Sequence, residues 1–288
     1  MRYEFIEKHR TEHSICLMCR VLEVSSSGFY AWRRRPESQR RREDRKLKVA
    51  IRSAFFAGRK SYGTVRIQGE LSDQGIRCGR QRIGRLMKEE GLVPKKARLF
   101  RRTTISAAHH SKAENVLNRQ FFVDSPDQIW AGDITYLLAG GSWLYLAVIL
   151  DLFSRRVVGW SISSSLGKEL AQSALTKALL ERAPGPGLLH HSDRGSQYTS
   201  TDYQNQLKKN HVVVSMSRKG DCWDNAVVES FFATLKVELG DTFSSRKAAK
   251  IALFDYIEVF YNRQRRHTTI GGMAPAQIEK LFAMADAA

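Results

Sequence analysis

The sequence predicts an α/β domain preceded by all-α, strongly basic domains, and three observations support this. Residues 1–118 hold 28 Lys and Arg against 12 Asp and Glu, whereas residues 119–288 hold 19 against 17. Apolar residues follow helical spacing in the basic half and strand alternation from about residue 127 onward. Three carboxylates of the neutral half fall in separate elements, without an evident structural duty.

The bulk composition is that of a globular protein, with 288 residues, 42% of them apolar, and a net charge of +18. No apolar run approaches the length that spans a bilayer, and the N-terminal MRYEFIEKHR is too charged for a signal peptide. The four cysteines do not predict a disulfide scaffold. We therefore expect a cytoplasmic protein with no membrane partner.

The uneven charge indicates a nucleic-acid-binding arm joined to a domain with another task. A highly charged ribosome-associated or membrane-surface protein is the alternative. That alternative does not explain why the second half of the chain is nearly neutral.

Residues 14–34 predict a first helix-turn-helix. One short helix has Ile15, Met18, Cys19 and Leu22 spaced for a single apolar face. After a turn, Ser25 or Ser26 is suited to cap a second helix, which carries the aromatic residues Phe29, Tyr30 and Trp32. A charged segment broken by Pro36 follows.

Residues 46–92 predict a second unit of the same design, with helices over 46–57, 62–75 and 78–91, the last closed by Gly91. Ile83, Leu86 and Met87 form the apolar side of its third helix. The remaining positions place four basic residues toward solvent or DNA phosphate: Arg80, Arg82, Arg85 and Lys88. Two small helical bundles with solvated basic faces are the alternative interpretation.

The spacing of His9, His13, Cys16 and Cys19 resembles a zinc site. Cys16 and Cys19 fall on a predicted helix, however, and Cys19 lies on its apolar face. Because free cysteine commonly serves as a small core residue, we expect no zinc there.

The neutral half predicts elements in the order β-β-β-α-β-α-β-α. Residues 128–138 alternate, with Trp130, Ile134 and Tyr136 on one face and Asp133 on the other. Residues 143–153 are almost continuously apolar, as expected of a central strand covered on both faces. A third strand over 155–163 completes an antiparallel meander.

The remaining elements alternate between helices and short strands. Helices are expected over 167–183 and 200–210, and strands over 188–191 and 211–217. A last helix over 224–240 has Asp224 as its cap and an apolar side formed by Val228, Phe231 and Leu235.

Three carboxylates can meet at one end of this sheet: Asp133 in the first strand, Asp193 just beyond the fourth, and Glu229 on the last helix. Mg²⁺ takes oxygen ligands, and a pair of such ions roughly 3.5–4 Å apart stabilises the attacking and leaving oxygens of phosphoryl transfer. Each carboxylate also has a purely structural interpretation: Asp133 as a polar strand residue, Asp193 as part of an Asx turn, and Glu229 as a charge on a helix surface. The three together favour a metal site.

Several segments resemble the second-reading-frame transposases of the bacterial insertion-sequence-3 family, within the retroviral-integrase superfamily. The resemblance rests on IWAGDITYL, LDLFSRRVVGW, HHSDRGSQYTS, SMSRKGDCWDNAVVESFFATLKVEL and YNRQRRHTTIGGMAPAQ. The basic segments CRVLEVSSSGFYAW and RIGRLMKEEGL are also similar, so it covers nearly the whole chain. The 35 residues between Asp193 and Glu229 match the D, D-35-E signature of the family.

The resemblance implies an RNase-H-like integrase core in which Asp133, Asp193 and Glu229 are catalytic and bind two Mg²⁺ ions, with Mn²⁺ as a substitute. It implies cleavage that frees a DNA 3′-hydroxyl, followed by strand transfer of that hydroxyl. The implied partners are the terminal inverted repeats, target DNA, further copies of the chain on DNA and an upstream reading-frame product or fusion. The implied location is the bacterial cytoplasm.

Further DNA contacts follow from the same resemblance. Lys236 lies seven residues after Glu229, on the same side of its helix, and is expected to contact phosphate, with a solvated lysine as the alternative. Arg266 and His267 match the recurring YN…RRH stretch, and they either touch DNA or close the fold. Asp151 and Asp224 are expected to be structural.

The expected domains are residues 1–45, a helix-turn-helix with a basic linker; 46–106, the second helix-turn-helix-like domain; 107–118, a linker; 119–240, the catalytic core; and 241–288, a helical extension of the core. Two other functions stay open: a DNA-binding regulator with a non-catalytic α/β domain, and an RNase-H-like nuclease that only hydrolyses. Inverted repeats flanking the gene would favour the transposase.

Overall fold

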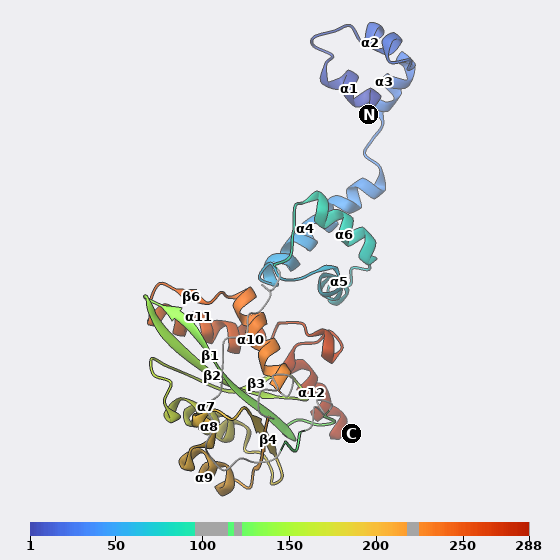
Figure 1. Cartoon of the computed structure of the whole chain (residues 1–288). Helices are drawn as coiled ribbons and strands as arrows, with labels where there is room; N and C mark the ends of the chain where they lie inside the picture. The colour runs from blue at the N-terminus through green and yellow to red at the C-terminus, as the bar shows by residue number, and fades with distance from the viewer. Residues whose placement is uncertain (96–114, 118–122, 218–224, 288) are drawn as a thin grey trace. The chain divides into compact units, whose positions relative to one another are not determined.

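The computed structural model describes residues 1–95, 115–117, 123–217 and 225–287 (Figure 1). Two compact units divide the chain, one over Met1–Ala50 and one over Ile51–Ala288, and each is described by itself. The expected Asp224 cap lies outside the described residues. No helix in the described part of the chain is both long and apolar enough to cross a membrane.

The first unit contains three short helices: α1 (Arg2–Lys8), α2 (Ile15–Val21) and α3 (Ser26–Arg34). Their core is Ile6, Met18, Cys19 and Phe29. The prediction that Cys19 faces an apolar core is therefore confirmed. Ser25 caps α3, because its hydroxyl accepts a hydrogen bond from the Gly28 N–H at 3.2 Å.

Helix α4 (Gln39–Ala57) begins before residue 46, inside the segment expected to be a linker, so the expected boundary between residues 45 and 46 falls within a helix. The end of α4 then joins α5 (Thr64–Asp73) and α6 (Arg80–Glu89). Ile83, Leu86 and Met87 of α6 are buried, as predicted. Gly91 follows α6 with φ 65°, the left-handed conformation that commonly ends a helix.

One mixed sheet forms the centre of the second unit, with strand order β3-β2-β1-β4-β5 and β6 beside β1. The strands are β1 (Ile129–Ala139), β2 (Ser142–Asp151), β3 (Val157–Ser163), β4 (Leu189–Ser192), β5 (Val213–Met216) and β6 (Thr242–Phe243). The first three form the predicted antiparallel meander, and β4 and β5 run parallel to β1. This is the RNase-H-like arrangement.

One face of the sheet is covered by α7 (Lys168–Arg182), α8 (Ser196–Thr199) and α9 (Thr201–Lys209) (Figure 1). Gly159 of β3 lets α7 approach closely, since a Cβ there would lie 2.4 Å from the Ala174 carbonyl oxygen. Trp130 of β1 is fully buried against this layer.

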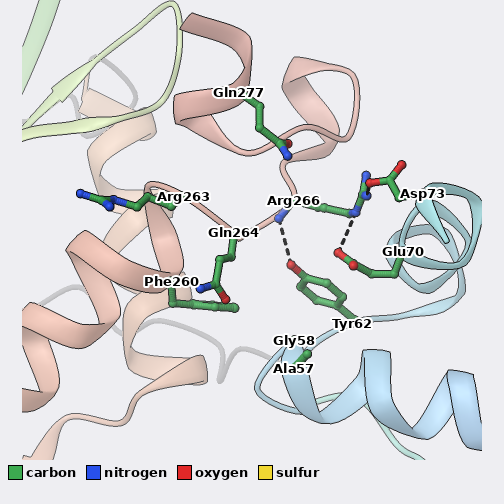
Figure 2. Close-up of a pocket in the computed structure, with 10 residues that line it drawn as sticks. All are labelled: Ala57, Gly58, Tyr62, Glu70, Asp73, Phe260, Arg263, Gln264, Arg266 and Gln277. Carbon is green, nitrogen blue, oxygen red and sulfur yellow. Dashed lines mark hydrogen bonds and ion pairs between the residues drawn. The ribbon is translucent and has the colours of Figure 1, made fainter. Parts of the chain in front are cut away.

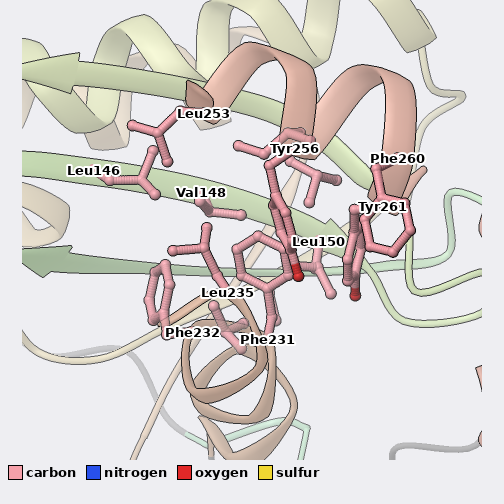
Figure 3. Close-up of a cluster of buried hydrophobic side chains, with 14 of the residues drawn as sticks. Leu146, Val148, Leu150, Phe231, Phe232, Leu235, Leu253, Tyr256, Phe260 and Tyr261 are labelled. Atoms are coloured by element: carbon pink, nitrogen blue, oxygen red, sulfur yellow. The ribbon is translucent and has the colours of Figure 1, made fainter. Parts of the chain in front are cut away.

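The opposite face is covered by α10 (Ala226–Glu238), α11 (Arg246–Phe254) and a π-helical segment, η2 (Asp255–Tyr261). Figure 3 shows Phe231, Phe232 and Leu235 of α10 packed against β2 and η2. The chain then passes through a 3₁₀ turn, η3 (Thr268–Ile270), to α12 (Pro275–Asp286). Burial on both faces confirms β2 as a central strand.

Candidate active site

Asp133 is held on the α10 side of the sheet by the alternation of β1. Its neighbours on that face, Ala131 and Leu137, belong to the core that α10 covers, while Trp130 belongs to the opposite core. The Asp133 side chain is partly buried, and its Oδ1 accepts a hydrogen bond from the Ile134 N–H at 2.7 Å. The predicted face of Asp133 is confirmed.

Asp193 stands at the carboxyl end of β4, next to Asp133 across the sheet. Strand β4 pairs in parallel with β1, and Ser192 lies opposite Gly132, so the residues that follow each are neighbours. Asp193 Oδ1 accepts a hydrogen bond from the Gly195 N–H at 2.9 Å. Asp193 thus forms an Asx turn, and this turn leaves the side chain exposed.

Glu229 is carried on the first turns of α10, which lies over the same face of the sheet as Asp133. Val228 and Phe231 anchor that helix in the core. Near the helix start, Asn225 Nδ2 donates to the Gly132 carbonyl oxygen at 3.4 Å. Glu229 itself is exposed.

The three carboxylates influence one another electrostatically. Burial, followed by the charges of Asp193 and Glu229, raises the pKa of Asp133 to about 8, against the opposing effect of the hydrogen bond from the Ile134 N–H. Partial desolvation by neighbouring protein atoms also raises the pKa of Asp193, although its side chain still reaches solvent. The fold therefore places Asp133 within electrostatic range of both other carboxylates.

The described residues contain no group of three or more His, Cys, Asp or Glu side chains close enough to hold a metal ion. Asp133, Asp193 and Glu229 thus come from three elements to the region where β4 ends beside β1, without forming a closed ligand cage.

A layer of buried aromatic and histidine side chains packs on the opposite side of β1 and β4 from Asp133. Gly132 allows it, since a Cβ there would lie 2.9 Å from His190 Cε1. The His190 Nε2 and the Tyr203 hydroxyl are hydrogen-bonded at 2.6 Å. Burial, and then the charges of Asp133, Tyr203 and Asp193, raise the pKa of Tyr198 well above its usual value. Tyr198 is therefore a neutral, fully protonated neighbour of the two aspartates.

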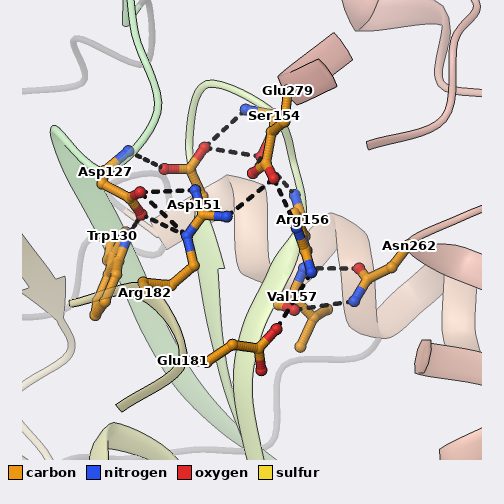
Figure 4. A network of polar contacts seen from close by, with 10 residues as sticks. All are labelled: Asp127, Trp130, Asp151, Ser154, Arg156, Val157, Glu181, Arg182, Asn262 and Glu279. Atoms are coloured by element: carbon orange, nitrogen blue, oxygen red, sulfur yellow. Dashed lines mark hydrogen bonds and ion pairs between the residues drawn. The ribbon is translucent and has the colours of Figure 1, made fainter. Parts of the chain in front are cut away.

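Asp151, expected to be structural, is fully buried at the end of β2 (Figure 4). Its carboxylate accepts hydrogen bonds from the Asp127 N–H at 2.7 Å and from the N–H and hydroxyl of Ser154 at 2.8 and 2.9 Å. Arg182 and Glu279 extend the network and join α7 to α12. The structural interpretation of Asp151 is confirmed.

Lys236 lies partly buried on α10, and its ammonium sits over the Tyr136 ring, 4.9 Å from the centroid. This cation–π contact holds the Lys236 ammonium beside β1. On α6, Arg80, Arg85 and Lys88 are exposed and Arg82 is partly buried, and Arg85 pairs with Glu89. Phosphate contacts by these residues stay predictions.

Arg266 and His267 are both engaged within the fold. Figure 2 shows Arg266 beside Glu70 and Tyr62: its Nε donates to Glu70 at 2.7 Å, and its N–H donates to the Tyr62 hydroxyl at 2.9 Å. The guanidinium also pairs with Asp73. A cavity of about 270 Å³ lies between the second helical region and the C-terminal segment, and Arg266, its three partners and Gly58 are among the residues that line it. A DNA contact by Arg266 or His267 stays a prediction.

Sequence reasoning missed the buried pair of Arg265 and Glu238. Arg265 Nε donates to Glu238 Oε2 at 2.8 Å, and the Ser61 and Tyr256 hydroxyls also donate to this carboxylate. A signal was present, because Glu238 continues the apolar stripe of Val228, Phe231 and Leu235. A charge on the buried side of a helix predicts a buried partner.

Comparison with known proteins agrees with this architecture. The integrase core domain family matches residues 123–222 and, through a second family of the same description, residues 229–280. An HTH-like domain family matches residues 41–99, which include α5 and α6.

Curated relatives match nearly end to end. Transposase InsF for insertion sequence IS3A of Escherichia coli (strain K12) is 44% identical over 283 residues, which cover 97% of this chain and 98% of the relative. The insertion element IS600 uncharacterized 31 kDa protein of Shigella sonnei is 44% identical over 267 residues, 92% of this chain and 98% of that protein. Among solved structures, the HTLV-2 integrase catalytic core domain in complex with magnesium matches with a TM-score of 0.41 and 20% identity, over 54% of this chain and 97% of that chain.

The sheet and the family matches define an integrase-core enzyme of the polynucleotidyl transferase kind, joined to an HTH-like DNA-binding domain. The near-complete match to curated transposases specifies the relationship. The chain belongs to the transposases of the insertion-sequence-3 (IS3) family.

Proposed function

We propose that the protein catalyses Mg²⁺-dependent 3′-end cleavage and strand transfer of insertion-sequence DNA through Asp133, Asp193 and Glu229. The observation that carries this proposal is the electrostatic coupling of Asp133 to both other carboxylates at one edge of the sheet. A structural role for each acid alone does not require that crowding.

The donor chemistry of the edge fits divalent cations. All three side chains offer hard carboxylate oxygens, the ligands that Mg²⁺ prefers, and a cation would offset the repulsion that raises the pKa of Asp133. Asp133, Asp193 and Glu229 would hold two ions, with Mn²⁺ as a substitute. When bound, such a pair stabilises the attacking and leaving oxygens of phosphodiester displacement. The proposal requires Glu229 to approach the aspartates, because the described structure does not close the site.

The protein groups around this edge would position DNA. Tyr198, kept neutral by burial, adds no negative charge beside the aspartates. Lys236, on the Glu229 side of α10, would contact a phosphate near the reacting end. Arg80, Arg82, Arg85 and Lys88 of α6 would contact the backbone of the same duplex at a distance from the chemistry.

The chemistry proposed has two displacements. In the first, water attacks a phosphodiester at the element end, which leaves a 3′-hydroxyl on the element and a 5′-phosphate on the flanking strand. In the second, that 3′-hydroxyl attacks another phosphodiester and displaces its 3′-oxygen, so one bond forms and one breaks. The partners would be terminal repeats, target DNA, further copies of the chain and an upstream reading-frame product, in the bacterial cytoplasm.

A strand-transfer assay tests the proposal. Labelled duplexes that carry the inverted repeat flanking the gene are incubated with Mg²⁺ or Mn²⁺ and with the wild type or Glu229→Gln. We expect the variant to bind duplex normally and to lose cleaved and joined products, since it keeps the shape of Glu229 and removes its charge. Glu169→Gln is the matched control, because Glu169 is an exposed acid of α7 on the opposite face of the sheet.

The outcomes separate the three candidate functions. Joined products that depend on Glu229 support strand transfer. Nicked products without joining would favour the hydrolytic nuclease. Binding without either product, also in the presence of an upstream reading-frame product, would favour the DNA-binding regulator.

A further inference from the structure

A second cavity, of about 270 Å³, borders α10 on the flank next to Glu229. Its wall on that helix includes Ser230 and Thr234, which lie one turn apart. The cavity reaches the surface at Thr268 and Thr269, whose side chains are exposed. It therefore lies beside the proposed catalytic helix and is distinct from the carboxylate edge.

Three guanidinium groups line this cavity: Arg66 from α5, Arg155 from the turn between β2 and β3, and Arg265 from the segment after η2. The buried carboxylate of Glu238 neutralises Arg265. No ion pair joins Arg66 or Arg155 to an acid anywhere in residues 1–95, 115–117, 123–217 and 225–287. The cavity therefore carries two guanidinium groups that have no ion-pair partner among the described residues.

Both of these arginines also have a buried donor without an acceptor. The Nε atoms of Arg66 and Arg155 are buried, and neither has a hydrogen-bond partner within the described part of the chain. A buried unpaired donor costs about 1–3 kcal/mol, and more when it is charged. Such groups indicate a ligand that accepts hydrogen bonds and carries negative charge.

The nearby acids are already engaged. Glu238 accepts from Arg265, Ser61 and Tyr256, and Asp151 accepts from backbone and hydroxyl groups at the end of β2. Burial lowers the pKa of Arg66 and of Arg155, and for Arg66 the charge of Arg265 adds to the effect. The charges of Glu238 at Arg66 and of Asp151 at Arg155 oppose this lowering without reversing it. An anion in the cavity would relieve this unfavourable surplus of charge.

The neutral groups of the cavity suit the same ligand. Burial and the charges of Arg265, Arg66 and Arg155 lower the pKa of His267 to about 2, so His267 is uncharged and accepts a hydrogen bond from Arg265 at 3.2 Å. Thr268 and Thr269 offer hydroxyl donors beside the guanidinium groups. Guanidinium and hydroxyl donors together are typical of phosphate recognition.

We propose that this cavity binds one backbone phosphate of the DNA substrate, with Arg66 and Arg155 as its two cationic contacts. The inference rests on the proposed function for the identity of the polyanion. It adds a contact that joins the HTH-like region, through Arg66 of α5, to the catalytic core, through Arg155. One phosphate held between these two parts sets the register of the duplex along α10.

The salt dependence of DNA binding tests this directly. The affinity of the full chain for a fluorescent duplex is measured by anisotropy over a series of salt concentrations, without divalent cations. Each phosphate contact contributes about −0.9 to the slope of log K against log salt. Because both arginines hold the same phosphate, we expect the double variant Arg66→Gln, Arg155→Gln to flatten that slope by about 0.9, and each single variant to flatten it by no more than that.

Lys209→Gln is the matched control, because it removes one exposed charge from α9 on the opposite face of the sheet. Slopes of the arginine variants equal to the wild type, or no flatter than that of Lys209→Gln, would overturn the assignment. Inorganic phosphate that raises the Tm of the wild type but not of the double variant, with unchanged duplex slopes, would assign the cavity to a small anion instead.

A second variant keeps the test independent of core folding. Thr269→Glu places a carboxylate at the exposed edge of the cavity and is expected to weaken duplex binding at least about tenfold, whereas Thr201→Glu on α9 is not. Equal affinities of these two variants would contradict the proposal. The binding assay needs no cleavage, so the two proposals can fail separately. If the wild type joins no strands but the arginine variants flatten the salt slope, only the proposed function is contradicted. If the wild type joins strands but the arginine variants leave the slope unchanged, only this inference is contradicted.

Discussion

Arg265 and Glu238 form a buried ion pair in which the side chains are only 4% and 2% exposed. Arg265 donates to both carboxylate oxygens, from Nε at 3.0 and 2.8 Å and from the second terminal nitrogen at 2.9 Å. The pair connects the end of α10 to the segment that follows η2. The Ser61 hydroxyl, in the loop before α5, also donates a hydrogen bond to the Glu238 carboxylate. This one carboxylate therefore connects three parts of the second unit.

Removing one partner of this pair should be strongly destabilising. Glu238→Gln leaves the Arg265 charge buried without compensation, and we expect a loss of about 3–5 kcal/mol in the free energy of unfolding. Urea unfolding followed by circular dichroism measures it. Asp202→Asn is the control, since its pair with Lys168 is on the surface, and it should cost no more than about 1 kcal/mol. Equal costs for the two variants would contradict the burial of the pair.

Arg266→Ala should lower stability without changing the electrostatic component of DNA binding. It removes hydrogen bonds to Glu70 and Asp73, worth about 1–3 kcal/mol together. Thermal unfolding and the salt slope of duplex binding are measured on the same protein. Arg263→Ala, an exposed neighbour, is the control. A flatter salt slope with unchanged Tm would instead make Arg266 a DNA contact.

Asp133→Asn should stabilise the protein in the absence of divalent cations. The pKa of Asp133 is raised from 3.8 to about 8, so its contribution to stability is present below pH 3.8 and is lost as pH rises through about 8. The asparagine removes this charge repulsion, and the Tm should rise most above pH 8, by about 2–4 °C for each kcal/mol gained. A lower Tm at that pH, with chelator present, would show that the aspartate is not under repulsion.

Stability should fall in mild acid because two buried histidines are neutral in the fold. Burial, followed by the charge of His191, lowers the pKa of His190 from 6.5 to about 4. That contribution is present above pH 6.5 and is lost as pH falls toward about 4, while His267 continues the loss to lower pH. Between pH 6.5 and about pH 4, the Tm should decline more steeply in the wild type than in His190→Gln. Parallel declines would contradict a depressed pKa.

Much of the fold was predictable because its signals are local. The alternation in β1, the apolar run of β2 and the capping serine of α3 are properties of short segments, and each was confirmed. Elements whose local signal is weak were not located individually: β6 is two residues long, and α12, which lies within the expected helical extension over 241–288, is stabilised by contacts such as that of Glu279 with Arg182. The early start of α4 was hidden because charged residues form a helix without an apolar stripe.

The candidate site divides in the same way. The sequence alone gives the types and order of the candidate site residues and the spacing between Asp193 and Glu229. Their convergence depends on the parallel pairing of β4 with β1, which brings Ser192 opposite Gly132. The cavity of Arg66 and Arg155 had no sequence signal at all, because its two cations are separated by almost ninety positions along the chain and meet only through packing.

The sequence by itself determined the class of the protein, through a basic helical half, a mixed α/β half and a near-complete similarity to curated transposases. Only the tertiary structure decided which charges are buried, paired or left uncompensated. Arg265 and Arg266, adjacent in sequence, pair with acids that lie 27 and 196 positions away, while Arg155 has no acidic partner in the described residues. The reason is physical. The sequence specifies which side chains carry a charge, but the desolvation of a charge and its pairing with an opposite charge depend on distances that only folding sets.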